Sequence, residues 1–83
     1  MKISMMDYYN EYHEELNKVG QVLRDYRKYS YLSRYDVEDK YGISRSLVER
    51  AEKGSNITLI TLFRLCDIYD LSPAELMDEL ENS

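Results

Sequence analysis

From residue 33 onward, signals for the start and the end of a helix follow one another at short intervals. Serine and threonine side chains favour a helix N-terminus, and glycine favours the left-handed conformation that ends a helix. The predicted N-caps and ends are Ser33, Ser44, Thr58, Ser72, Gly42 and Gly54. Pro73 and Glu75 strengthen the last start, because proline fits the first helical position and glutamate completes a capping box. This part of the chain can therefore form only short helices, over residues 33–41, 44–53, 58–69 and 72–80.

Before residue 33, apolar residues recur in alternating steps of four and three, which places them on one face of a helix. They are Met5, Tyr9, Tyr12, Leu16, Val19, Leu23 and Tyr26. Gly20 lies within this run and costs a helix about 1 kcal/mol relative to alanine. Two alternatives follow. Either one long helix forms, or two consecutive helices form with Asn17 as the N-cap of the second.

These patterns predict an all-α fold, a compact bundle of four to five short helices. On the helix over residues 33–41, Val37 and Tyr41 form a short apolar stripe. The broad core face predicted for the helix over 58–69 contains Leu59, Leu62, Phe63, Leu65, Cys66 and Tyr69. The last helix is expected to contribute Leu76, Met77 and Leu80.

Composition excludes several classes of function. A chain of 83 residues allows one domain with a modest core. The single cysteine, Cys66, excludes an internal disulfide framework, and the single histidine, His13, has no second ligand at metal-binding spacing. No glycine-rich phosphate loop occurs, so we expect no enzyme, no metal and no cofactor. No apolar run reaches the roughly 18–20 residues of a membrane span, and no signal peptide is visible. We expect a cytoplasmic protein without a membrane partner.

Charge is distributed unevenly along the chain, although the net charge is −5. Residues 18–34 carry a net charge of +4, from Lys18, Arg24, Arg27, Lys28 and Arg34 against Asp25. The flanking segments are acidic, at −3 over residues 1–17 and −5 over residues 54–83. A domain of this kind can present one positive face while remaining acidic overall. The alternative is ordinary solvated helix surface.

Gly42 and Ile43 join the predicted helices 33–41 and 44–53 with the spacing of a helix-turn-helix, in which glycine permits the tight turn. At this point the sequence resembles the Cro/repressor-like (XRE) helix-turn-helix family. The matching residues, over about 18–77, are Val19, Gly20, Leu23, Arg27, Leu32, Ser33, Val37, Tyr41, Gly42, Ile43, Ser44, Val48, Glu52, Lys53, Gly54, Leu59, Leu62, Leu65, Leu71, Ser72 and Leu76. The resemblance implies a repressor-like DNA-binding domain over residues 18–80. We expect it to form a single compact unit with an N-terminal helical extension over residues 1–17.

The resemblance also implies that helix 44–53 lies in the major groove of double-stranded DNA. The implied DNA-contacting residues are Lys28, Arg34, Ser44, Arg45, Ser46, Glu49, Arg50 and Lys53. Arg45 can bind guanine through two hydrogen bonds, and Arg34 falls where the family often has a phosphate-contacting glutamine. Glu49 has an alternative role, an ion pair with Arg45 or Lys53 one helical turn away. Glu52 falls at the family's usual glutamate, for which we expect a structural role.

Two positions depart from the family pattern. Glu38 stands where the family favours alanine, because two helices cross closely there. Its side chain must turn toward solvent or meet a cation, since an unpaired buried charge would cost several kcal/mol. Ile57 replaces a common proline in the loop before the helix over 58–69. Acidic residues on the same face would also suit a helix-turn-helix that binds proteins.

The family implies a transcription regulator that binds double-stranded DNA sequence-specifically, and we expect a homodimer on a palindromic operator. The N-terminal extension lies outside the family pattern, and it either packs on the domain's own core or forms a surface for self-association. The candidate interface residues are Met5, Tyr8, Tyr9, Tyr12, Met77 and Leu80. The alternative function is an antitoxin-like or antirepressor-like protein-interaction module, which binds a protein partner through its N-terminal helix.

Overall fold

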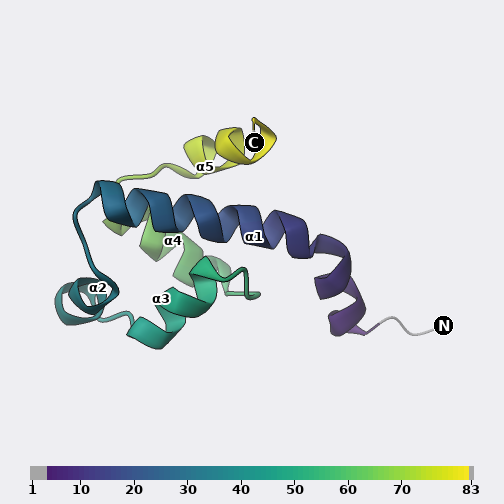
Figure 1. The fold of residues 1–83 in the computed structure, drawn as a ribbon, viewed down its shortest axis with the longest axis horizontal. Helices are drawn as coiled ribbons and strands as arrows, with labels where there is room; N and C mark the ends of the chain where they lie inside the picture. The colour runs from purple at the N-terminus through teal and green to yellow at the C-terminus, as the bar shows by residue number, and fades with distance from the viewer. Residues whose placement is uncertain (1–3, 83) are drawn as a thin grey trace.

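The computed structural model describes residues 4–82, which form five α-helices and no strand. The helices are α1 (Met5–Tyr29), α2 (Arg34–Tyr41), α3 (Arg45–Glu52), α4 (Leu59–Ile68) and α5 (Pro73–Glu81). In Figure 1, α1 runs through the middle of the molecule, with α5 on one side and the pair α2 and α3 on the opposite side. The predicted all-α bundle is confirmed.

Side-chain caps begin the helices at the predicted residues. The Ser33 hydroxyl accepts a hydrogen bond from the backbone N–H of Asp36 at 2.9 Å, and the Asp36 carboxylate accepts one from the backbone N–H of Ser33 at 2.8 Å. Both N–H groups would otherwise lack a partner at the helix start. Hydroxyls also cap the next three helices, through Ser44, Thr58 and Ser72. Gly42 ends α2 with a φ of 76°, a conformation that strains residues with a side chain.

The first helix, α1, is continuous over 25 residues, so the alternative of two consecutive helices is wrong. Asn17 lies inside the helix and caps nothing. Gly20 is required by a close approach of α3: a Cβ atom there would lie 2.5 Å from the backbone oxygen of Glu52 and 2.7 Å from that of Ala51. The weak helix propensity of this glycine is therefore outweighed by the packing of α1 against α3.

Residues from all five helices form the core. Its buried apolar residues are Val22, Leu23, Val37, Ile43, Val48, Ala51, Leu65, Cys66, Tyr69, Leu71 and Leu76. The core face predicted for α4 is too broad, because Leu59 and Phe63 are exposed. Leu59 lies at the start of the buried stripe and Phe63 lies beside it, where no neighbouring side chains bury them. Tyr41 on α2 is exposed as well, contrary to expectation, and Met77 on α5, a candidate interface residue, is also exposed.

We call residues 4–17 the N-terminal arm. This part of α1 continues the apolar face of the helix and, as Figure 1 shows, projects beyond the other helices. Its exposed large apolar side chains are Met5, Met6, Tyr8 and Tyr12. Tyr9 and Leu16 are half-buried, and the Tyr9 hydroxyl donates a hydrogen bond to the backbone oxygen of Gly54 at 3.3 Å. The hypothesis that this segment packs on the domain's own core therefore holds only for Tyr9 and Leu16.

Candidate nucleic-acid interface

The helices α2 and α3 form a two-helix unit whose outer side is open to solvent. Gly42, Ile43 and Ser44 connect them, and the Ile43 side chain is buried between the two helices and the core. Because α3 turns Val48 and Ala51 inward, its opposite face is polar. The exposed residues of α3 and its C-cap are Arg45, Ser46, Arg50 and Lys53. One face of α3 therefore packs on the core, and the opposite face is accessible to a partner.

Glu52, the last residue of α3, links three helices through two arginines. Its carboxylate accepts hydrogen bonds from Arg27 Nε at 2.7 Å and Arg34 Nη2 at 3.0 Å, and only 3% of its side chain is exposed. The hydrogen bond to Glu52 raises the pKa of Arg27, whose Nη1 also donates to the backbone oxygen of Leu32 at 2.9 Å. Glu52 thus has the structural role that the resemblance implied. Arg34 is held against α3, with 38% of its side chain exposed.

Arg45, the first residue of α3, is bound by two residues of α2. The Glu38 carboxylate accepts hydrogen bonds from the backbone N–H of Arg45 and from its guanidinium Nε, both at 3.1 Å. The guanidinium carbon lies 5.5 Å from the centre of the Tyr35 ring, within the range of a cation–π contact. Of the two alternatives for Glu38, the contact with a cation is confirmed. Its charge is paired and partly exposed, so the cost of burying an unpaired carboxylate does not arise.

Glu49 forms an ion pair with Lys53 at 2.8 Å, one helical turn away. The ammonium group of Lys53 lowers the pKa of the Glu49 carboxyl by hydrogen bonding. This ion pair was the expected alternative to a DNA contact. Ser46, Arg50 and Lys28 are exposed, and their side chains have no hydrogen-bond or ion-pair partner within residues 4–82. Arg50 is therefore the cation of α3 whose side chain contacts no carboxylate within residues 4–82.

The charge of the two-helix unit is balanced. Its basic residues are Arg34, Lys40, Arg45, Arg50 and Lys53, and its acidic residues are Asp36, Glu38, Asp39, Glu49 and Glu52. Ion pairs hold Arg34, Arg45 and Lys53. An anionic ligand must therefore share these cations with carboxylates that already contact them. The positive surface of this face is confined to a few places.

Tyr35 belongs to this surface although the sequence analysis did not single it out. It stands three residues before Glu38 on α2, so both side chains lie on one side of the helix and meet the first residue of α3. The i, i+3 spacing of an aromatic and an acidic residue, with an arginine just past the turn, was the available signal. It becomes specific only when the crossing of α2 and α3 is known.

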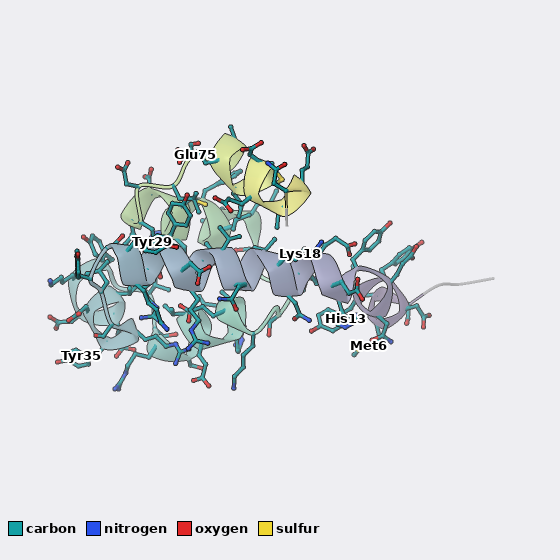
Figure 2. The ribbon with its side chains drawn as sticks, turned by 45° about the horizontal axis from the view of Figure 1, so that its top comes forward. Met6, His13, Lys18, Tyr29, Tyr35 and Glu75 are labelled. Carbon is teal, nitrogen blue, oxygen red and sulfur yellow. The ribbon has the colours of Figure 1, made fainter. Side chains whose placement is uncertain are left out.

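The single histidine and the single cysteine take no part in a metal site of the described chain. Within residues 4–82 no group of three or more His, Cys, Asp and Glu side chains could hold a metal ion. His13 lies on the exposed N-terminal arm (Figure 2), and Cys66 is a core residue whose thiol pKa is raised by burial. Over the same residues, no helix has the length and apolar character needed to cross a bilayer.

Comparison with known families agrees with this geometry. The family described as a helix-turn-helix domain matches residues 18–80, which include the two-helix unit and the core around it. No curated protein and no solved structure matches the chain. The chain belongs to the helix-turn-helix domain family, whose fold binds DNA.

Proposed function

We propose that this protein is a transcription regulator that binds double-stranded DNA sequence-specifically, with α3 in the major groove. The observation that carries the proposal is the open outer face of α3, where Arg45, Ser46 and Arg50 stand on a helix fixed to the core by its other face. The major groove, about 12 Å wide, admits one α-helix. Arg45 and Ser46 occupy the N-terminal turn, from which such helices contact base edges.

Contacts to the phosphate backbone position α3 in the groove. Arg34 is the first residue of α2, where the helix dipole favours an anion. Glu52 accepts hydrogen bonds from Nε and Nη2 of Arg34, so Nη1 is left to donate to a phosphate oxygen. We assign the remaining contacts to Lys28, Ser44, Glu49, Arg50 and Lys53. Glu49 would accept a hydrogen bond from cytosine, in exchange for its ion pair with Lys53.

A homodimer completes this proposal, because one copy of α3 covers only one half-site. Two copies related by a twofold axis would contact half-sites about 34 Å apart on a palindrome. The surface that we assign to the dimer includes Met5, Tyr8, Tyr9 and Tyr12 on α1 and Met77 and Leu80 on α5. Tyrosine and methionine are enriched at protein interfaces. The exposed side chains of the N-terminal arm support this assignment.

Selection from a random-duplex library tests the proposal. The full chain is incubated with duplexes randomised over about 20 base pairs, enough for two half-sites one helical turn apart. At about 100 mM salt, where phosphate contacts still contribute, the retained sequences should contain a palindrome. Arg50→Ala should lower the affinity for it about tenfold, since the variant loses a contact made by an unpaired cation.

Lys18→Ala is the matched control for Arg50→Ala. It removes the same charge, but Lys18 lies on the part of α1 that faces α5 and not α3 (Figure 2). Its affinity should stay close to that of the unchanged protein. Failure of a folded protein to enrich any sequence would contradict the proposal. Equal losses in the two variants would contradict the assignment of α3.

A protein-interaction module, antitoxin-like or antirepressor-like, is the second candidate. The exposed arm favours it, because Met5, Met6, Tyr8 and Tyr12 offer apolar surface beyond the helix-turn-helix core. Salt separates the two functions. DNA binding should weaken with a slope of about −0.9 per phosphate contact in a plot of log affinity against log salt. Binding through the apolar arm should change little with salt.

A further inference from the structure

Arg45 is held by α2 in a way that leaves the outer edge of its guanidinium free. Within the guanidinium, Glu38 accepts a hydrogen bond only from Nε. The Nη1 and Nη2 groups of Arg45 have no hydrogen-bond partner within residues 4–82, and 60% of the Arg45 side chain is exposed. A guanidinium carries five N–H donors in a planar fork. Guanine presents O6 and N7 side by side in the major groove, and two parallel donors are needed to bind both. The two Nη groups of Arg45 are such a pair.

We propose that Glu38 and Tyr35 are positioning residues that fix Arg45 for guanine and thereby determine the sequence specificity of α3. This inference rests on the proposed function, since it concerns how the DNA is recognised. Neither residue is assigned a contact with a base. Both act through Arg45, the first residue of the recognition helix.

Two contacts hold the guanidinium of Arg45, and a third holds its backbone. One carboxylate oxygen of Glu38 accepts the backbone N–H of Arg45 and the other accepts Nε, so the carboxylate ties the start of the helix to the side chain. The Tyr35 ring lies against the guanidinium and restricts the tilt of its plane. Glu38 is itself anchored in the last turn of α2, where its backbone oxygen accepts the N–H of Gly42 at 3.0 Å.

Such an arrangement favours specificity over affinity. A long arginine side chain loses much rotational freedom when it binds, and holding it beforehand reduces that loss for the correct base. The carboxylate also weakens the general attraction of α2 for phosphates, as does Asp39 beside it. Discrimination depends on the difference between correct and incorrect sites. Glu38 therefore acts on that difference twice, through geometry and through charge.

Asp39 separates these two effects experimentally. It is an exposed carboxylate on the same helix, with no hydrogen-bond or ion-pair partner in the part of the chain that the structure describes. Asp39→Ala removes the same charge as Glu38→Ala but leaves Arg45 held. A purely electrostatic role of Glu38 would make the two variants equivalent. A positioning role would not.

The test repeats the random-duplex selection with variants of the full chain. The unchanged protein should retain guanine at one position of each half-site, and Arg45→Ala should lose that preference about tenfold or more. In Glu38→Ala and Tyr35→Ala, the preference for guanine should fall about threefold or more at that position alone, because Arg45 remains but is no longer held. Glu38→Gln keeps one acceptor, so its preference for guanine should lie between that of the unchanged protein and that of Glu38→Ala. Asp39→Ala should keep the preference. Circular dichroism confirms that each variant folds.

A spectroscopic measurement adds a readout that needs no DNA. The Nε–Hε proton of Arg45 should exchange slowly with water in the unchanged protein and quickly in Glu38→Ala, as its hydrogen bond is lost. Equal exchange in both would overturn the inference. So would an unchanged guanine preference in Glu38→Ala, or equal losses in Glu38→Ala and Asp39→Ala. If the unchanged protein enriches no sequence, the proposed function fails first and this inference with it. If the unchanged protein enriches a sequence but Arg45→Ala keeps the preference for guanine, only this inference fails.

Discussion

At the scale of single residues, Glu52 stabilises the fold most directly, because it neutralises a buried arginine. Removing one partner of a buried ion pair leaves the other charge uncompensated, which costs about 3 kcal/mol or more. Arg27 is 7% exposed and would be left in that state. We expect Glu52→Ala to lower the free energy of unfolding by about 3 kcal/mol, measured by urea unfolding.

Glu49→Ala is the matched control on the same helix. Its ion pair with Lys53 is exposed on both sides, and exposed pairs contribute little. The urea midpoint should therefore move far less than in Glu52→Ala. Similar shifts in the two variants would show that the Arg27–Glu52 pair gives no particular stability. Adding Arg27→Met to Glu52→Ala should restore part of the loss, since no charge is then left buried.

The capping box of α2 makes stability depend on pH. Hydrogen bonds from the backbone and side chain of Ser33 lower the pKa of the Asp36 carboxyl. A group with a lower pKa in the folded state stabilises the fold above its unfolded pKa of about 3.9. That contribution is lost as the pH falls through the folded value. Asp36→Asn should therefore make the loss of stability below about pH 4 shallower.

Urea midpoints measured at successive pH values check this expectation. Asp39→Asn is the control, because this carboxylate lies on the same helix without a hydrogen bond to a capping serine. Its acid limb should follow that of the unchanged protein. An Asp36→Asn curve that coincides with the unchanged one would mean that the capping box does not contribute to acid stability.

At the scale of elements, the crossing of α1 and α3 depends on Gly20. Alanine would gain about 1 kcal/mol in helix propensity, but its Cβ would meet two backbone oxygens of α3 at 2.5 and 2.7 Å. Backbone atoms cannot rotate away as a side chain can. We expect Gly20→Ala to destabilise the fold by about 2 kcal/mol net. Asn10→Ala, at an exposed position of the same helix, should be neutral or slightly stabilising.

Thermal unfolding of these two variants decides the point. Stabilisation by Gly20→Ala would mean that α3 can move aside at little cost, and the crossing would then not depend on glycine. Helix propensity alone does not decide whether α1 is one continuous helix. The sequence shows the cost of glycine within a helix, but only the fold shows what passes beside it.

Elements with local signals were predictable, and those with distant partners were not. The hydroxyls of Ser33, Ser44 and Ser72 contact backbone groups within three residues, so their roles follow from sequence alone. The exposure of Phe63 depends on whether another helix covers it. The residues of α3 were placed on the outer face by periodicity, yet the partners of Arg45 come from α2. Glu38 was a partial exception, because its misfit with the family pattern already required its carboxylate either to turn toward solvent or to meet a cation.

At the scale of the whole molecule, an acidic protein can still present a DNA-binding face. Residues 54–83 carry a net charge of −5, and α5, which holds most of the carboxylates of this segment, lies across α1 from α2 and α3 (Figure 1). Helix α1 lies between these carboxylates and the two-helix unit, and salt at 0.1 M screens exposed charges beyond about 10 Å. Acidic groups on the far side would then repel phosphates only weakly, and they would favour the proposed orientation with α3 toward the DNA.

In the proposed homodimer, the N-terminal arm brings two such faces together. We expect Tyr8→Asp combined with Tyr12→Asp to convert a dimer to a monomer in analytical ultracentrifugation, because a charge at each exposed tyrosine opposes burial in an interface. Folding should be unaffected, since both side chains already face solvent. Binding of a palindrome should weaken about 100-fold, as the second half-site is no longer reached intramolecularly. Affinity for a single half-site should be unchanged.

Tyr29→Asp combined with Tyr31→Asp is the control for the change in mass. These tyrosines are also exposed, but they lie at the end of α1 away from the arm and add the same two charges. The control should remain dimeric. If the arm variant also stays dimeric, the dimer forms elsewhere, and Met77 and Leu80 on α5 become the surface to substitute next. If the unchanged protein is already a monomer and still binds a palindrome tightly, the two copies associate only on the DNA. The arm is then free for another protein.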